Sequence, residues 1–214
     1  MTMKTSSALE HIIRTRRSVR SFTDEIPTEE HIRKIVESGI YAPYGGATGI
    51  PLERIRRVFV FRQGTAPMDA AVAILNAQLR ANSKKINRAI TFLPFLRKKM
   101  GAFARKLKGF STAGIPSMSA APYFIVLAEK KGFPPIEKES QAHAFENMWL
   151  MATELGLGFQ LISAVSTLSG NRDFLELLGL NKGEYALGGC VVGYPKNPST
   201  EEKELSVDSF VRWM

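Results

Sequence analysis

Cysteine and histidine are scarce in this sequence of 214 residues. The single cysteine, Cys190, cannot form an intrachain disulfide, and a metal cluster built from the cysteines of one chain is excluded. The three histidines, His11, His31 and His143, are scattered without the spacing of metal ligands, so a zinc site has little support. The N-terminal stretch contains no apolar run, and we expect neither a signal peptide nor a membrane-spanning helix there. These absences indicate a reducing compartment, and we expect a cytoplasmic protein.

Acidic residues are absent from one long central segment. No aspartate or glutamate lies between Asp69 and Glu129. The whole chain has a formal net charge of +9, so the basic residues of this segment account for the excess. They are Arg80, Lys84, Lys85, Arg88, Arg97, Lys98, Lys99, Arg105, Lys106 and Lys108.

The basic segment, residues 82–110, is interrupted once by Pro94 and has the pattern of a cationic amphipathic helix in its second half. Leu96, Met100, Phe103 and Leu107 fall on one helical stripe, surrounded by basic residues. We expect this stripe to pack against the body of the protein or against a partner subunit. A helix lying on a membrane surface is the alternative. We expect no nucleic-acid partner, because neither an aromatic stacking platform nor a known recognition motif accompanies the charge.

Helical and strand patterns alternate irregularly along the chain. Ser7 to Glu10 has the form of a capping box, and Asn171 can cap a later helix that Gly179 ends. We predict helices over residues 8–15, 28–42, 67–79, 95–110, 139–155 and 172–178, strands over 57–62, 123–128 and 185–192, and a short extended segment over 159–164. Because the elements do not alternate strictly, the α+β class is favoured, with 44% hydrophobic residues sufficient for a packed core.

Three arginines and a serine are concentrated in Arg16-Arg17-Ser18-Val19-Arg20, at the exit of the first predicted helix. Guanidinium groups offer forked donors that match phosphate oxygens, and a serine hydroxyl adds another donor. This composition is typical of a phosphate site. A solvated basic end of a helix is the alternative, because cations near a helix C-terminus complement its dipole.

The sequence shows no convincing Ser/His/Asp set, Cys/His pair or pair of catalytic carboxylates, which argues against a hydrolase. By contrast, Tyr44-Gly45-Gly46 allows the backbone to approach a ligand closely, since glycine has no side chain. The residues therefore favour ligand binding by cations and backbone over nucleophilic catalysis.

Several motifs follow one another along the chain: Arg16-Arg17-Ser18-Val19-Arg20, Ala42-Pro43-Tyr44-Gly45-Gly46, Glu146-Asn147, Leu155-Gly156-Leu157-Gly158, Leu178-Gly179-Leu180 and Val192-Gly193-Tyr194-Pro195. Their order resembles the FMN-dependent nitroreductase family over nearly the whole chain outside the basic segment.

This resemblance implies a single nitroreductase-like domain over residues 1–214, with a mainly antiparallel central sheet flanked by helices. It implies an intertwined homodimer with FMN at each of two interface pockets. Hydride would pass from NADH or NADPH through flavin N5 to a nitroaromatic, quinone or similar small-molecule acceptor. No protein nucleophile is needed, because the flavin performs the chemistry. The basic segment, about residues 82–118, would be the substrate lid that this family varies.

The resemblance also implies roles for particular residues. The cluster that binds the FMN phosphate corresponds to Arg16, Arg17, Ser18 and Arg20, with a further basic residue near the C-terminus at Lys203. The loop that the opposing subunit places over the flavin corresponds to Pro43, Tyr44, Gly45 and Gly46. The backbone amides that meet flavin N5 and O4 correspond to Ser163 and Ala164.

The chain departs from the family pattern after Gly46. The polar flavin contacts that usually follow are replaced in Ala47-Thr48-Gly49-Ile50-Pro51-Leu52-Glu53, which suggests altered redox tuning or a different substrate. Two alternatives stay open. One is a reductive dehalogenase-like flavoenzyme, although the basic segment lacks the glutamate and tyrosine that clamp an amino-acid substrate. The other is a flavin-poor module whose cationic helix binds an anionic membrane or an acidic partner.

Overall fold

A four-stranded antiparallel sheet organises the computed structural model, which describes residues 7–44 and 49–214. The strands are β1 (Arg56–Arg62), β2 (Tyr123–Lys130), β3 (Gly158–Leu161) and β4 (Tyr185–Gly193). They lie in the order β1-β2-β4-β3, and each neighbouring pair is antiparallel. The prediction of an α+β fold with an antiparallel sheet is confirmed. Gly45 and Gly46 lie outside the described residues.

The two central strands are buried on both faces, which explains their continuous apolar sequence. All residues of β2 from Tyr123 to Glu129 are buried. Side chains alternate between the faces, so that Phe124 and Val126 enter one core while Ile125 and Leu127 enter the other.

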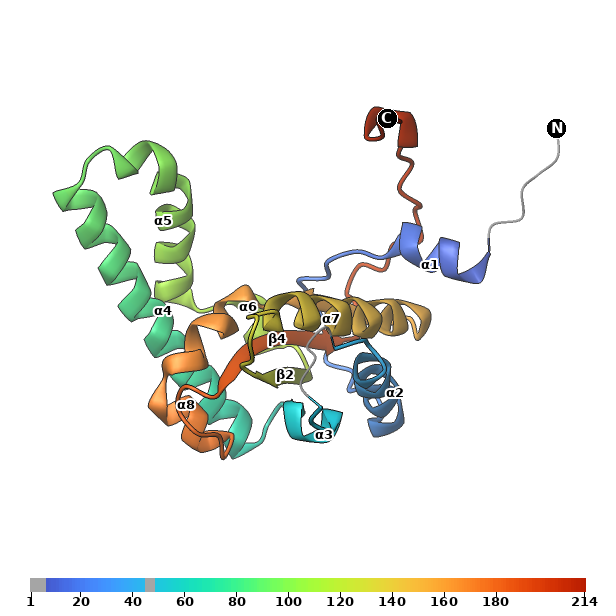
Figure 1. Cartoon of the computed structure of the whole chain (residues 1–214), viewed down its shortest axis with the longest axis horizontal. Coiled ribbons are helices and arrows are strands. Elements are labelled where there is room, and N and C mark those ends of the chain that lie inside the picture. Colours follow the sequence, from blue (N-terminus) through green and yellow to red (C-terminus); the bar gives the residue numbers. More distant parts are fainter. Residues whose placement is uncertain (1–6, 45–48) are drawn as a thin grey trace.

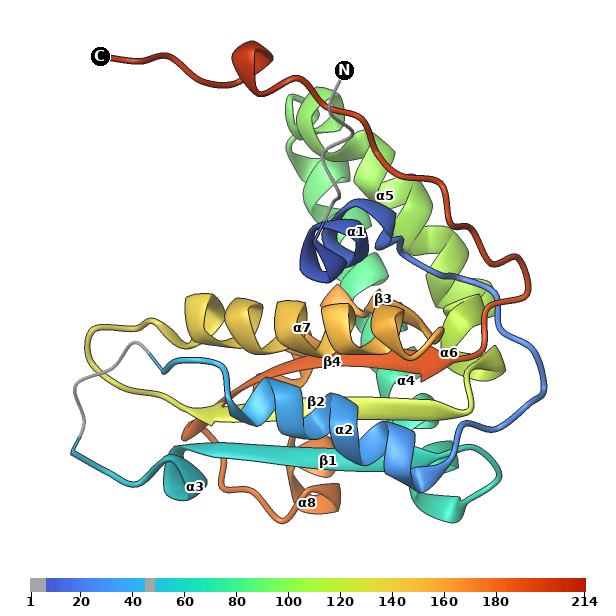
Figure 2. The same ribbon diagram turned by 90° about the vertical axis from the view of Figure 1, so that its right-hand side faces the viewer.

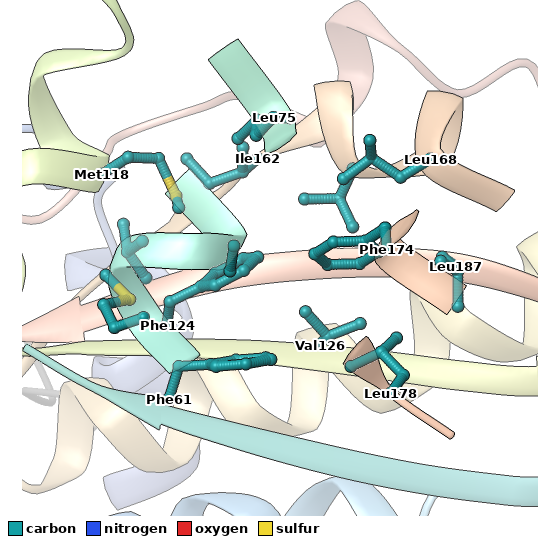
Figure 3. Close-up of a cluster of buried hydrophobic side chains, with 14 of the residues drawn as sticks. Phe61, Leu75, Met118, Phe124, Val126, Ile162, Leu168, Phe174, Leu178 and Leu187 are labelled. Atoms are coloured by element: carbon teal, nitrogen blue, oxygen red, sulfur yellow. The ribbon is translucent and has the colours of Figure 1, made fainter. Parts of the chain in front are cut away.

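One face of the sheet is covered by α2 (Glu29–Ile40) and α7 (Glu137–Glu154), as Figure 2 shows. The opposite face is covered by α4 (Ala66–Phe92), α6 (Pro116–Ala120), α8 (Arg172–Leu177) and the 3-10 helix η1 (Ser163–Gly170). In this second core, Phe61 and Phe124 stack with ring centroids 5.5 Å apart, and Phe174 and Leu168 pack above the strands (Figure 3).

Local capping signals set the starts of three helices. The Ser7 hydroxyl accepts from the Glu10 N–H at the start of α1 (Ala8–Thr15). Thr28 caps α2 in the same way, and the side chain of Asn171 caps α8. These three predicted starts are confirmed, because each depends on residues within one turn.

Two predicted boundaries are wrong. The helix expected to end at Leu79 continues to Phe92, because no glycine or proline interrupts it before Pro94. Ser163 and Ala164, predicted to be extended, instead open η1, since β3 ends at Leu161. Short helices that the sequence did not predict are α3 (Leu52–Ile55), α6 and the 3-10 helix η2 (Val207–Ser209).

The second half of α4 and α5 (Leu96–Ala113) form a helical hairpin, hereafter the hairpin, that projects from the sheet (Figure 1). With 27 residues, α4 is roughly 40 Å long at 1.5 Å per residue. Its first half packs on the sheet through Met68, Ala71 and Leu75, and its far half contacts α5. No described helix combines the length and apolar character needed to cross a membrane.

A buried ion pair connects four elements at one end of the sheet. Arg56 on β1 donates from Nε to Glu129 Oε1 on β2 at 2.7 Å, and Ser140 on α7 bonds both side chains. The Arg56 guanidinium also donates to the carbonyl oxygens of Gly39 at 2.8 Å and Ala42 at 2.9 Å. These carbonyls lie at the end of α2, where helical partners are missing. Arg56 therefore fixes the point from which the chain enters the glycine loop.

Substituting Arg56→Met is expected to lower the free energy of unfolding by about 3–5 kcal/mol, because Glu129 would stay buried without its counter-ion. Urea unfolding followed by circular dichroism measures this loss. Arg54→Met, at an exposed position on α3, is the matched control and should change stability by less than about 0.5 kcal/mol. A loss below about 1 kcal/mol for Arg56→Met would show that the pair does not organise this end of the sheet.

Candidate binding cavity

A cavity of about 920 Å³ lies between the hairpin and the segment from β3 into η1. Three cations line it: Arg20 from the N-terminal segment, Lys85 from α4 and Lys106 from α5. Apolar walls come from Phe103, Leu107, Phe110, Ile115, Leu161 and Ile162, and polar groups from Asn82, Gln160, Ser163, Ser166 and Thr167. This combination suits a ligand with an anionic end and a flat apolar body.

Backbone pairing places Arg20 at the cavity. Ser18 forms a parallel bridge with Phe159, and the Val19 N–H donates to the Phe159 carbonyl at 3.0 Å. Glycine is required at position 158, because a Cβ there would lie 2.6 Å from Val19 Cγ1. The N-terminal segment therefore runs against β3, and Arg20 follows directly beside the cavity wall.

The structure brings the predicted residues Ser163 and Ala164 into the same cavity as Arg20. They are the first two residues of η1. The first N–H groups of a helix have no partner within that helix, so this turn presents backbone donors to a ligand. The backbone of Ser163 and Ala164 is therefore helical, not extended as predicted, and their N–H groups remain available as donors.

The other predicted phosphate ligands of the N-terminal cluster make contacts outside the cavity lining. The Arg16 guanidinium lies 4.1 Å from the centre of the Trp149 ring, and its Nε is 3.2 Å from Glu146 Oε1. Arg17 donates to three backbone carbonyls, among them that of Glu201 at 2.6 Å. Ser18 is exposed. Within one chain, Arg20 alone of the predicted cluster lines the cavity.

Lys203 lies next to this cluster through its backbone. Its N–H donates to the Arg14 carbonyl at 3.1 Å, and the neighbouring Glu202 bonds His11 at 2.7 Å. The C-terminal segment is therefore held along α1 and Arg17, with the Lys203 side chain exposed. Its role toward a phosphate stays a prediction.

Neither Pro43 nor Tyr44 lines the cavity of its own chain. Tyr44 is close to Gly132, and burial is the main cause that raises the pKa of its phenol, with the nearby Glu129 carboxylate adding to the effect. The cavity residue Leu161 pairs with Cys190, which pairs in turn with Ile125 on β2. Ile125 is four residues from Glu129, or about 13 Å along the strand at about 3.3 Å per residue. One chain therefore does not bring Tyr44 into its own cavity.

Sequence reasoning missed Asn82 and Lys85, which line the cavity from α4. It placed them at the start of a lid, although the uninterrupted helical pattern before Pro94 was the signal that α4 continues. Asn82 is also oriented by neighbouring amides: Gln78 Nε2 donates to Asn82 Oδ1 at 3.0 Å, and Asn171 Nδ2 donates to Gln78 Oε1 at 3.1 Å. With its oxygen occupied in this way, Asn82 retains its amide N–H groups for a ligand.

Cys190 is fully buried in β4, and burial raises the pKa of its thiol well above the ordinary value. A protonated buried thiol is unreactive, so Cys190 acts as a small packing residue. Ile50 is exposed and lines a different cavity, of about 440 Å³, together with Arg54 and Tyr185. Ala47 and Thr48 lie outside the described residues.

Comparison with known families gives a match to the Nitroreductase family over residues 13–194. Three similar solved structures are a BluB-like flavoprotein from Clostridium difficile 630, a nitroreductase with bound FMN from Bacteroides fragilis NCTC 9343, and a nitroreductase with bound FMN from Desulfitobacterium hafniense DCB-2. Comparison with curated proteins gives no significant match.

All three structures cover 97% of this chain, and the coverage of their own chains is 99%, 99% and 98% in the same order. Their identities are 18%, 20% and 20%, with TM-scores of 0.70, 0.68 and 0.68. At these identities the likeness shows the fold. Because the family match spans most of the sequence, the chain belongs to the Nitroreductase family.

Proposed function

We propose that this protein is an FMN-dependent oxidoreductase that passes hydride from NADH or NADPH to a nitroaromatic, quinone or similar acceptor. The observation that carries the proposal is the cavity, which gathers Arg20, Lys85 and the N-terminal turn of η1 in a member of the Nitroreductase family. Bound FMN would supply the hydride-carrying centre, so the chain itself needs no nucleophile.

The residues of the cavity fit FMN in size and in chemistry. A volume of about 920 Å³ lies within the range of about 300–1,000 Å³ that cofactor and ligand pockets occupy. A flavin phosphate carries about two negative charges, which Arg20 and Lys85 can neutralise and orient through charge-assisted hydrogen bonds. The walls formed by Ile162, Leu161 and Phe110 suit a flat aromatic ring.

The backbone N–H groups at the start of η1 are hydrogen-bond donors on one wall of the cavity. The N–H groups of Ser163 and Ala164 are fixed by the helical turn and cost no reorganisation when a polar ring edge meets them. The Asn82 amide, oriented through Gln78, adds a further positioned donor on the opposite wall. These groups would hold the polar edge of a bound flavin ring in one orientation.

A second copy of the chain would complete this site. Pro43 and Tyr44 do not line the cavity of their own chain, so another subunit would have to supply them to it. Exposed apolar side chains favour such an assembly: Leu9 and Ile13 on α1, and Leu205, Phe210 and Trp213 near the C-terminus. We therefore propose a homodimer with two shared sites.

The hairpin side of the cavity favours an acceptor that is apolar and carries negative charge. Phe103 and Phe110 provide aromatic surface, and the Lys106 ammonium lies 5.7 Å from the centre of the Phe110 ring. No carboxylate lines this cavity within the described part of the chain, so an anionic acceptor meets no like charge.

Substituting Lys85→Ala is expected to weaken FMN binding roughly 10- to 100-fold, which corresponds to the loss of one hydrogen bond to a charged group, about 1.5–3 kcal/mol. Quenching of FMN fluorescence on titration with protein measures the dissociation constant. Lys84→Ala is the matched control, because Lys84 is adjacent on α4 and lines a different groove. Equal affinities for wild type and both variants would contradict the placement of FMN in this cavity.

Substituting Ile13→Asp on α1 is expected to convert the dimer to a monomer, because a charge would enter the apolar subunit contact. Analytical ultracentrifugation shows the change in mass, and the fraction of FMN retained on gel filtration should fall in parallel. Phe133→Asp serves as the control, since Phe133 is 96% exposed on the loop after β2. A monomeric Ile13→Asp variant that retains FMN normally would contradict a site shared between subunits.

A further inference from the structure

The tip of the hairpin exposes three apolar side chains that are close together in the sequence. Phe92 is 81% exposed and Phe95 is 72% exposed, with the half-exposed Leu93 between them. They occupy the break between α4 and α5, which is the part of the hairpin farthest from the sheet in Figure 1. A cluster of aromatic and aliphatic side chains at the end of a projecting element is costly in water. It therefore points to an apolar partner.

The flanks of the hairpin carry unneutralised positive charge. All ten lysines and arginines between Arg80 and Lys108 are exposed, and none forms an ion pair with another residue of the described ranges. Arg97, Lys98 and Lys99 follow the tip within the first turn of α5. The apolar tip is therefore carried by a hairpin whose cations have no counter-ions among the described residues.

A second groove, of about 730 Å³, lies between α4 and α5 on the hairpin. Its cations are Arg80, Lys84, Arg88 and Lys108, and its hydroxyl groups come from Thr91, Ser111 and Thr112. The three hydroxyl groups are used within the helices, because each donates its proton to a backbone carbonyl. The ammonium and guanidinium groups are the donors that can bind phosphate, and no carboxylate is part of this lining. The exposed ring of Phe92 also lines this groove, so the phosphate-binding groups continue directly to the apolar tip.

We propose that the hairpin docks on the surface of an anionic lipid bilayer. Phe92, Leu93 and Phe95 enter the interfacial layer, while the groove cations and Arg97 to Lys99 bind lipid phosphates. The combination of a cationic flank and a short apolar tip matches both energy terms of interfacial binding, which are apolar burial and attraction to anionic headgroups. Because no described helix can cross a membrane, the contact is peripheral.

Charge and geometry favour a bilayer over other occupants. A second copy of this chain also has a formal net charge of +9, so pairing two copies through the hairpin would bring like net charges together. A single-stranded nucleic acid would need aromatic rings distributed along a cationic groove. Here the two most exposed rings of the hairpin, Phe92 and Phe95, are gathered at its end. A planar surface can reach such an end without contacting the sheet.

The docking surface is separate from the proposed flavin site, although the two share helices. Lys85 and Lys106 line the cavity, whereas Lys84 and Lys108 line the groove on the hairpin. No residue of the tip lines the cavity, and none supplies its backbone donors. Membrane binding and FMN binding can therefore be tested independently in the same protein.

The test is flotation of the full-length protein with vesicles of phosphatidylcholine, with and without added phosphatidylglycerol, at about 0.05 and 0.5 M NaCl. We expect wild-type protein to float with the anionic vesicles at low salt and to remain unbound with neutral vesicles. High salt should release most of the bound protein, because surface charges are then screened. Failure to bind anionic vesicles at low salt would overturn the proposal.

Charge reversal at Arg97, Lys98 and Lys99 to glutamate should lower the partition coefficient at least about 100-fold, since each cation near an anionic surface contributes about fivefold. The matched control reverses three exposed cations away from the hairpin and gives the same net charge: Lys131→Glu, Lys138→Glu and Lys182→Glu. The control should bind anionic vesicles much more tightly than the hairpin variant. An equal loss in both would mean that net charge alone drives binding, which would overturn the assignment to the hairpin.

Insertion of the tip is tested by Phe95→Ser, which should lower the partition coefficient about fivefold, because aromatic area is no longer buried in the interface. Phe133→Ser, at an even more exposed ring on the body, should leave binding unchanged. Fluorescence of a Phe95→Trp variant should also be quenched by brominated lipid. A tip variant that binds vesicles like wild type would overturn insertion.

Two other results would assign the tip to a different partner and so overturn the proposal. One is dissociation of a wild-type dimer by Phe95→Ser in analytical ultracentrifugation, which would make the tip a subunit contact. The other is tighter, variant-sensitive binding to a labelled single-stranded oligonucleotide than to vesicles. Retention of FMN should be unchanged in all the hairpin variants, which shows that they are folded.

Discussion

The buried contact between Arg56 and Glu129 is the constraint on which this architecture depends. It joins the edge strand β1 to the central strand β2, and through the carbonyls of Gly39 and Ala42 it holds the end of α2. A charged pair with almost no solvent exposure needs hydrogen bonds to offset its desolvation, and Ser140 bonds both side chains. All of these bonds reach Glu129 through Oε1, and the buried Oε2 has no hydrogen-bond partner among the described residues. The same contact sets where the chain leaves α2 toward Tyr44 and the glycine loop. In the proposed dimer, it therefore helps to position the segment that one subunit would contribute to the site of the other.

The long helix α4 connects the core both to the cavity and to the groove of the hairpin. Its first half packs on the sheet, and its second half presents Lys85 to the cavity and Lys84 to the groove of the hairpin. Adjacent positions on a helix point in different directions, so neighbouring lysines serve different surfaces. This division accounts for a basic segment that is longer and more charged than a cofactor phosphate requires. If the hairpin lies on a bilayer, α5 connects that surface to the cavity wall formed by Phe103 and Lys106, and an amphiphilic acceptor would have a short path between them.

Much of the fold follows from local sequence, and less of the site does. The helix starts at Ser7, Thr28 and Asn171 were predicted because each capping contact lies within three residues of its helix. The buried strand β2 was predicted from its continuous apolar run. By contrast, the position of Arg16 over Trp149 and the role of Lys85 depend on contacts between segments far apart in the chain, which no local pattern encodes. The length of α4 was also underestimated. The basic residues after Leu79 were assigned to a lid because of their charge, although the helical pattern continues to Phe92. The loop of Gly45 and Gly46 stays a prediction.

The central claim, that the cavity holds FMN that a pyridine nucleotide can reduce, is tested most directly by anaerobic spectroscopy of the dialysed, FMN-reconstituted protein. The account predicts about one FMN retained per chain, with absorption bands near about 370 and 450 nm that bleach when NADH or NADPH is added. The bands should return when a quinone or nitroaromatic acceptor is supplied. Absence of retained flavin at micromolar FMN, or a retained flavin that neither nucleotide reduces, would contradict the account.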